Sequence, residues 1–424
     1  DYMRQNKTIA SCAVALSALV VASCTTGGDS KGKNVIDIAQ AVANPVEMKV
    51  SDLGKTIRYV PLETTDSSLV GDSWVLTPAD GAVLISNVNN GGLEAEACLS
   101  FGLDGKFISG VGHYGQDPEA YWSSECVIAP DNKSAYFAAS NGMQHYSIDG
   151  QYLGKTCRAG MIGMPGVTVA VDTMFIAVED GLVGKDSPRC FSIYSEGFST
   201  FTVDTVEIIP YPKDATKGWY YNNVSICRVD GVMRNAKNVY REYDEGGNIT
   251  YRQGYLRTVW RVGQTVHHRE LLSDTIYAIT PASAEVAYVF DCGDDRITAE
   301  LIAEQKGLRS NTLFVSDIVE TNDRMIFGAS RGWLGSEGNR TFVGIYDKNT
   351  GATRAGDGAK GFVDDLAGFM PFYPLAALPD GSLVGVITMD DVAKYTEENP
   401  DAKIPAEIAA LEEDANPILV IVGN

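Results

Sequence analysis

The sequence predicts an all-β protein, a six-bladed β-propeller of four-stranded antiparallel blades with a short helical insertion near the C-terminus. Three observations predict this fold. Short strand-like runs continue almost to the end of the chain, an Asp-Gly hairpin pattern is repeated, and the stretch rich in strands is too long for a single sandwich. With 424 residues, 45% of them hydrophobic, the chain is long enough to bury a large core.

The predicted strands are short runs of apolar or alternating residues bounded by Gly, Asp and Asn. Helical patterns are confined to residues 298–306, 390–396 and 405–413, and the last two predict the insertion. We expect the late run 417–422 to pair beside the early run 57–62, because such closure leaves few exposed strand edges. The runs between them include AVLISNV (82–88), TVAVDTMFIAV (168–178), YLRTVWRV (255–262), TIYAIT (275–280), RMIFGAS (324–330), TFVGIYD (341–347) and SLVGVIT (382–388).

A repeated Asp-Gly hairpin is the most regular feature of the sequence. The segments FGLDGKFISGVGHYG (101–115) and YSIDGQYLGKTCRAG (146–160) share their aromatic, aliphatic, Asp-Gly and final Gly positions at a spacing of 45 residues. A spacing in this range is typical of propeller blades, and Asp-Gly between apolar runs favours a hairpin. The residues GVGHYG (110–115) also match the dinucleotide-binding fingerprint, but no helical pattern follows them, so we interpret the match as incidental.

The net charge of −21 restricts the classes of partner. Such an acidic surface repels nucleic-acid backbones and anionic membranes, so we expect no nucleic-acid partner. It is compatible with neutral or cationic ligands, and solubility alone is the simpler explanation of the charge.

The first residues have the pattern of a lipoprotein signal peptide. Arg4 and Lys7 precede an apolar stretch from Ile9 to Val21, which is too short to span a bilayer. It ends in Val-Ala-Ser-Cys, which resembles a bacterial lipobox, so we expect cleavage before Cys24 and lipidation of its thiol; an ordinary signal peptide with a chance cysteine is the alternative. The predicted organisation is a signal peptide at 1–23, a flexible tether at 24–45 and the propeller at 46–424.

The remaining cysteines leave the disulfide state open. They are widely spaced, with no C-x-x-C motif, and they are Cys98, Cys126, Cys157, Cys190, Cys227 and Cys292. An exported protein can form disulfides, but most of these cysteines lie in apolar runs, which equally favours buried free thiols.

The chain resembles the six-bladed β-propeller lipoproteins of gut anaerobic bacteria, which are similar to NHL and TolB-like propellers. Beside the lipobox, the matching segments are YVPLETTDSSLVG (59–71), FGLDGKFISGVGHYGQDPEAY (101–121), SDTIYAIT (273–280), AYVFDCG (287–293), the pair DD (364–365) and NPILVIV (416–422). That family usually shows Gly-Pro-Gly-Glu-Tyr where this chain has QDPEAY (116–121), so the turn there is expected to differ. The resemblance implies the fold and export, and it implies no particular activity.

Catalytic and metal-binding patterns are weak. Residues 328–332 match G-x-S-x-G, but no helix or later histidine completes a hydrolase triad. His267 and His268 are neighbours in a strand and point to opposite faces, so we interpret them as polar blade residues and not as a metal pair. Asp364 and Asp365 offer oxygens that suit calcium, although a solvated turn is the simpler interpretation. We predict no catalytic residue, no metal ligand and no cofactor, with calcium as the one cofactor left open.

Aromatic residues beside Gly, Asn and Asp are the better candidates for ligand binding, because sugar rings stack on aromatic faces while their hydroxyls form hydrogen bonds. Packing between blades is the alternative use of such residues. The candidates are Trp122, Trp219, Tyr220, Tyr221 and Trp333, together with His113 in the glycine-rich segment.

These patterns predict a non-catalytic ligand-binding or scaffolding protein, anchored to the cell envelope by lipid at Cys24, with a glycan or a peptide as its ligand. The outer membrane is the expected membrane, and the sequence does not decide between its periplasmic and its surface face. Two alternatives remain: a calcium-dependent propeller lyase or hydrolase, and a structural partner of an outer-membrane uptake complex.

Overall fold

A computed structural model describes most of the chain after residue 33. The described residues are 34–71, 74–87, 97–139, 142–156, 168–178, 189–194, 198–203, 240–243, 249–253, 259–270, 273–298, 311–332, 338 and 340–424. Residues 33–424 form one compact unit.

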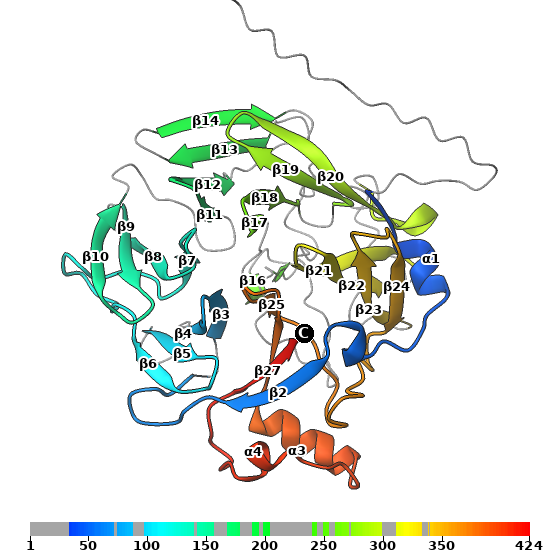
Figure 1. Cartoon of the computed structure of the whole chain (residues 1–424). Coiled ribbons are helices and arrows are strands. Elements are labelled where there is room, and N and C mark those ends of the chain that lie inside the picture. Colours follow the sequence, from blue (N-terminus) through cyan, green and yellow to red (C-terminus); the bar gives the residue numbers. More distant parts are fainter. Residues whose placement is uncertain are drawn as a thin grey trace, which may run out of the picture. The chain divides into compact units, whose positions relative to one another are not determined.

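The described chain is a β-propeller built from four-stranded antiparallel blades (Figure 1). Two blades follow directly from the repeated hairpin, since β5–β6 and β9–β10 are its two copies, which confirms that interpretation. The strands of the first blade are β3 (Trp74–Ala79), β4 (Ala82–Asn87), β5 (Ala97–Gly102) and β6 (Phe107–Gly110). The second contains β7 (Cys126–Ile128), β8 (Ser134–Ala139), β9 (Gly142–Ser147) and β10 (Tyr152–Thr156).

Two further blades have the same meander order, and a separate hairpin lies between them in the sequence. One blade contains β11 (Thr168–Val171), β12 (Met174–Val178), β13 (Arg189–Tyr194) and β14 (Phe198–Val203). The hairpin is β15 (Tyr240–Tyr243) with β16 (Ile249–Gln253). The other blade contains β21 (Leu313–Glu320), β22 (Arg324–Arg331), β23 (Arg340–Asp347) and β24 (Thr353–Asp357).

The closing blade joins the two ends of the described chain. Strand β2 pairs antiparallel with β27 from Thr56↔Gly423 to Pro61↔Ile418, which confirms the expected pairing of the early and late runs. Because β27 also pairs with β26, it is a central strand and exposes no edge. The strands of this blade are β25 (Ala376–Ala377), β26 (Leu383–Ile387), β27 (Ile418–Gly423) and β2 (Thr56–Pro61).

The prediction of six four-stranded blades is wrong in its count, because the described residues form five. The remaining large sheet has five strands, since β1 (Val35–Asp37) adds parallel to the edge strand β20. Its other strands are β17 (Val259–Val262), β18 (Thr265–His268), β19 (Thr275–Thr280) and β20 (Ser283–Asp291), followed by the short 3-10 helix η2 (Gly293–Asp295).

Residues 34–61, here called the N-terminal strap, run from sheet to sheet. After β1, helix α1 (Ile38–Ala43) begins at Asp37, whose carboxylate accepts the backbone N–H of Gln40, and the helix contacts β24. The strap continues through the 3-10 helix η1 (Val50–Asp52) into β2. Residues 35–43, which the sequence places in a flexible tether, therefore form regular structure, and Ile36 and Ile38 are fully buried.

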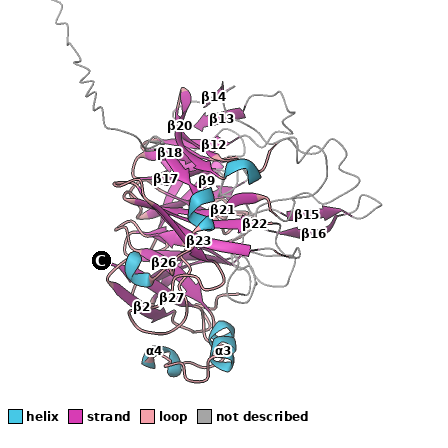
Figure 2. Cartoon of the chain, turned by 90° about the vertical axis from the view of Figure 1, so that its right-hand side faces the viewer, coloured by secondary structure: helices cyan, strands magenta, loops and turns pink. Residues whose placement is uncertain are grey.

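Helices are few and short, as Figure 2 shows. Helix α3 (Met389–Glu398) and helix α4 (Ala406–Ala409) lie between β26 and β27, which confirms the predicted insertion near the C-terminus. Thr388 begins α3 with a capping box, because its hydroxyl accepts from the backbone of Asp391 while the Asp391 carboxylate accepts from Thr388. The predicted helix at 298–306 lies almost wholly outside the described residues. Among the described helices, none is long and apolar enough to cross a membrane.

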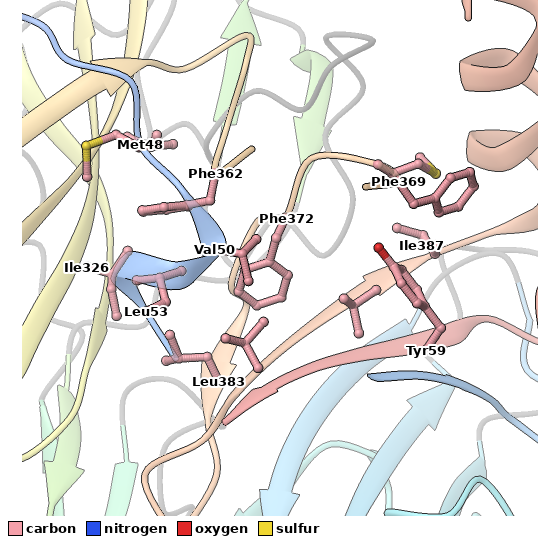
Figure 3. Packing of buried hydrophobic residues seen from close by; sticks show 14 of the residues in the cluster. Met48, Val50, Leu53, Tyr59, Ile326, Phe362, Phe369, Phe372, Leu383 and Ile387 are labelled. Carbon is pink, nitrogen blue, oxygen red and sulfur yellow. The ribbon is translucent and has the colours of Figure 1, made fainter. Parts of the chain in front are cut away.

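The largest apolar cluster joins the strap to the closing blade and the β21–β24 blade (Figure 3). Met48, Val50 and Leu53 of the strap pack there against Phe362 and Phe372, all 4% exposed or less. Burying such side chains contributes about 2 kcal/mol each, so the strap is a structural part of the propeller.

Candidate functional site

The innermost strands of the propeller surround a central cavity of ≈ 530 Å³. Strands β3, β7, β11 and β17 contact one another in this order, and β25 contacts both β21 and β3. Each innermost strand, or the residues that adjoin it, contributes a polar residue to the lining: Thr77, Glu125, Thr168, Arg261, Glu320 and Asp380. A cavity of this size accommodates a small ligand, and the mixture of polar and apolar lining suits an amphipathic one.

The Arg261 side chain lines this cavity and links two sheets. Its guanidinium donates to the carbonyl oxygens of Ala129 and Pro130 and to the Asn132 side chain, at 3.3, 3.3 and 2.9 Å. These acceptors lie in the β7–β8 turn, whereas Arg261 comes from β17, and β11 contacts both β7 and β17. Burial lowers the pKa of Arg261, although the nearby charge of Asp131 opposes this effect. Arg261 therefore ties two non-adjacent sheets together beside the cavity.

Glu320 is the centre of a buried polar cluster between the five-stranded sheet and the β21–β24 blade. Its carboxylate accepts from the Trp260 indole at 2.6 Å, contacts His267 Nδ1 at 2.8 Å, and pairs with Lys348 at 2.7 Å. Burial alone raises the pKa of Glu320, but the hydrogen bond from His267 and the charges of His267 and Lys348 outweigh it, so the pKa lies below its ordinary value. The side chain is fully buried, so the cluster fastens two sheets beside the cavity.

A compact loop at residues 112–124 leads from β6 into β7 and hence into the cavity wall. The Gln144 side chain holds it by donating to the carbonyl oxygens of Pro118 and Ala120, at 2.8 and 3.1 Å. The Tyr146 hydroxyl donates to the backbone carbonyl oxygen of Glu119 at 2.7 Å. Tyr121 is fully buried and stacks on Phe137. These contacts give the loop one defined conformation.

Gly112 is required at the start of this loop. Its φ is +66°, and a Cβ there would lie 2.8 Å from both Tyr121 and Tyr146. The middle glycine of the apparent dinucleotide fingerprint therefore serves close packing in a propeller loop. This supports the interpretation of the fingerprint as incidental.

The same loop carries two exposed aromatic side chains, Tyr114 at 58% and Trp122 at 44% exposure. His113 lies beside Tyr114 in the sequence and contacts the Asp117 carboxylate at 2.6 Å, and this hydrogen bond holds the pKa of Asp117 below its ordinary value. The structure thus places two predicted candidates, His113 and Trp122, on one loop. Sequence reasoning missed Tyr114, although its position between Gly112 and Gly115 indicated a turn.

The other predicted site residues lie outside the described part of the chain: Cys24, Trp219, Tyr220, Tyr221 and Trp333. Tyr114, Trp122 and His113 are therefore the candidate ligand-binding residues that the structure places. We call residues 112–124 the aromatic loop.

The acidic pair has a structural role in the fold. Asp364 is 4% exposed, and its carboxylate accepts the backbone N–H groups of Leu366, Ala367 and Phe369 and the Tyr59 hydroxyl. Residues 365–368 of this turn are exposed, so the interpretation as a solvated turn holds for Asp365, whereas the Asp364 carboxylate points inward and satisfies the polar groups of the turn.

The two histidines and the serine motif also have structural partners. His267 contacts Glu320, whereas His268 contacts Glu270, so the neighbours serve different sites as expected. Ser330 lies in β22, is 3% exposed and donates to the carbonyl of Gly332. Within the described ranges, no three His, Cys, Asp or Glu side chains are grouped so that they could hold a metal ion.

Comparison with known proteins supports the fold and gives a family. No curated protein matches the chain. A crystal structure from Bacteroides fragilis, described as a "Putative exported protein", has a TM-score of 0.56 and 14% identity, over 92% of this chain and 98% of that one. A member of the duf4221 family from Bacteroides vulgatus has a TM-score of 0.46 and 8% identity, over 87% and 96%.

At 14% identity, the likeness to the Bacteroides fragilis structure concerns the fold alone. The family model described as "Domain of unknown function (DUF4934)" matches residues 33–423, which is nearly the whole compact unit. This chain therefore belongs to the DUF4934 family.

Proposed function

We propose that this protein is a non-catalytic ligand-binding protein of the cell envelope, and that its ligand is a glycan bound at the aromatic loop. The observation that carries the proposal is the continuity of residues 113–126. They run from the exposed pair Tyr114 and Trp122 to Glu125 and Cys126, which line the central cavity.

The chemistry of the aromatic loop suits a sugar. Large aromatic faces that stay exposed on a defined loop provide a stacking surface at little cost in conformational entropy. His113 and Asp117 are about half exposed next to them and supply hydrogen-bond donors and acceptors for hydroxyl groups. A short peptide uses similar contacts and is the other ligand class to test.

Trp122→Ala is expected to weaken glycan binding about tenfold, because one lost stacking contact is worth roughly 1.4 kcal/mol. The melting temperature should stay unchanged, since the ring is 44% exposed. Binding is measured by titration calorimetry with the strongest hit of a glycan array, and a peptide array serves the other class. Leu153→Ala is the matched control, because Leu153 is exposed to 47% on β10 and lies outside the loop. Equal binding by Trp122→Ala and wild type would contradict the proposal.

The envelope location rests on the lipobox at Cys24 and on the description of the Bacteroides fragilis protein as exported. We propose that Cys24 carries the lipid that holds the protein at the outer membrane, where an uptake complex is a candidate partner.

Cys24→Ala is expected to move the protein from the membrane fraction to the soluble fraction, because the variant has no thiol for the lipid to modify. Fractionation and labelling with a radioactive fatty acid measure this change. Cys12→Ala, within the signal peptide, is the control and should leave the labelled protein in the membrane fraction. The proposed lipid anchor would be refuted if the Cys24→Ala protein still fractionates with membranes and the wild-type protein takes up no radioactive fatty acid.

A further inference from the structure

Two buried cysteines meet where the first blade packs against the second. Cys98 lies in β5 and Cys126 begins β7, and they are 1% and 6% exposed. Both belong to one apolar cluster with Val111, Tyr121 and Phe137. The two side chains are close enough for Cys126 to raise the pKa of the Cys98 thiol, and both are free thiols in this structure.

The backbone around this pair is fixed from both sides. The Ser86 hydroxyl donates to the Ser124 carbonyl at 2.7 Å, and the Ser124 hydroxyl donates to the Asn87 carbonyl at 2.6 Å. Ser86 is the cross-strand partner of Cys98, so these bonds hold the start of β7 beside β5. The backbone N–H of Cys98 donates to the Tyr121 hydroxyl at 3.2 Å, which ties the aromatic loop to the same point.

The environment does not suit a reactive thiolate. Burial, and then the contact with Cys126, raises the pKa of the Cys98 thiol, so the folded form carries no nucleophile here. A metal site is equally disfavoured, because the described residues offer no third ligand beside the two thiols. Two neighbouring thiols inside one apolar cluster are instead suited to form a covalent bond to each other, which needs sulfurs about 2.0 Å apart.

We propose that Cys98 and Cys126 form a disulfide in the exported protein, and that this bond fastens the aromatic loop between the first two blades. The proposal rests on the proposed export to the cell envelope, where disulfides persist. The bond would close the chain segment 99–125, which contains all of residues 112–124. It would therefore hold the candidate binding residues Tyr114 and Trp122 on a covalently closed loop.

The chemistry is thiol–disulfide exchange. One cysteine, as thiolate, attacks a disulfide oxidant, such as a periplasmic dithiol oxidase, and releases one of its thiols. The second cysteine then attacks the mixed disulfide, forms the Cys98–Cys126 bond and releases the other thiol. Two electrons pass to the oxidant, and the two protons from the cysteines are taken up by its thiols. Because both cysteines are buried in the fold, the reaction belongs to folding, before the two blades close.

The test uses the full-length protein isolated from its host envelope under denaturing conditions with an alkylating agent. Digestion without reductant, followed by mass spectrometry, is expected to give a peptide that joins Cys98 to Cys126 and lacks two hydrogen atoms. The mature N-terminus is read in the same digest. Alkylated Cys98 and Cys126 in correctly processed protein would overturn the proposal, whereas unprocessed protein would indicate that export itself has failed.

Substitutions provide a second measurement. Cys98→Ala and Cys126→Ala should each abolish the linked peptide and lower the melting temperature by about 5 °C relative to the oxidised wild type. Cys292→Ala is the matched control, because Cys292 is equally buried but lies in a different cluster, and its variant should keep the linked peptide. If reductant lowers the melting temperature of wild type and of Cys98→Ala by the same amount, the bond does not stabilise the loop and the proposal fails.

Discussion

Removal of residues 33–61 is expected to prevent the propeller from folding. This deletion removes β1, α1 and β2, and it leaves β27 without the partner that pairs along its whole length. It also removes buried side chains such as Ile36, Met48, Val50 and Tyr59, each worth about 2 kcal/mol. Their sum approaches the total stability of a typical domain, which is about 5–15 kcal/mol.

The measurement compares two shortened chains by circular dichroism and thermal melting. A chain that begins at residue 33 keeps the whole compact unit and is the control, expected to melt cooperatively. A chain that begins at residue 62 is expected to be insoluble or to show no cooperative transition, because β27 then presents an open edge of apolar residues. A cooperative transition in this shorter chain would show that the closing blade is stable without β2.

Glu320→Gln is expected to lower the free energy of unfolding by about 4 kcal/mol, which is the usual cost of removing one partner from a buried ion pair. The substitution keeps the size of the side chain, so the loss comes from charge. The ammonium group of Lys348, whose side chain is only 13% exposed, would lose the Glu320 carboxylate with which it pairs. The Trp260 indole and His267 would lose a charged acceptor. Urea denaturation at neutral pH measures the difference.

Glu397→Gln is the control, because Glu397 is exposed on α3 and should change stability by less than about 0.5 kcal/mol. The pH dependence gives a second signature. The pKa of Glu320 is lowered in the folded protein, so its contribution is present above the ordinary pKa of Glu and disappears as pH falls through the folded-state pKa. The stability difference between wild type and Glu320→Gln should therefore shrink below about pH 4. A difference that is independent of pH would contradict the assigned ion pair.

The sequence was sufficient for the fold class because strand patterns, turns and the hairpin repeat are local signals. The run at 417–422 and the run at 57–62 were predicted to pair, and β27 and β2 do so. The number of four-stranded blades was not predictable, because β1 has only three residues, Val35–Asp37, and follows a Gly-rich polar stretch. Its pairing depends on the free edge of β20, which no local pattern reveals.

The candidate site was only partly predictable, for the same reason. His113 and Trp122 could be proposed because they adjoin the glycine-rich hairpin segment. The cluster around Glu320 could not be predicted. Trp260 and His267 come from one hairpin, but they meet Glu320 and Lys348 only when two sheets pack. Cys98 and Cys126 likewise gave no motif in the sequence, because the spacing of a disulfide pair is set by the packing of blades.

The N-terminal strap also determines how the propeller responds to mechanical force. A pull on residue 33 acts first on β1, whose hydrogen bonds to β20 run across the strand direction. Force along β1 therefore loads these bonds together in shear and does not unzip them one by one. Behind β1, helix α1 and the strap up to β2 contact the β21–β24 blade and the closing blade, so the load is shared by three sheets. A protein held by its N-terminal end in flowing medium would thus resist unfolding from the end at which it is held.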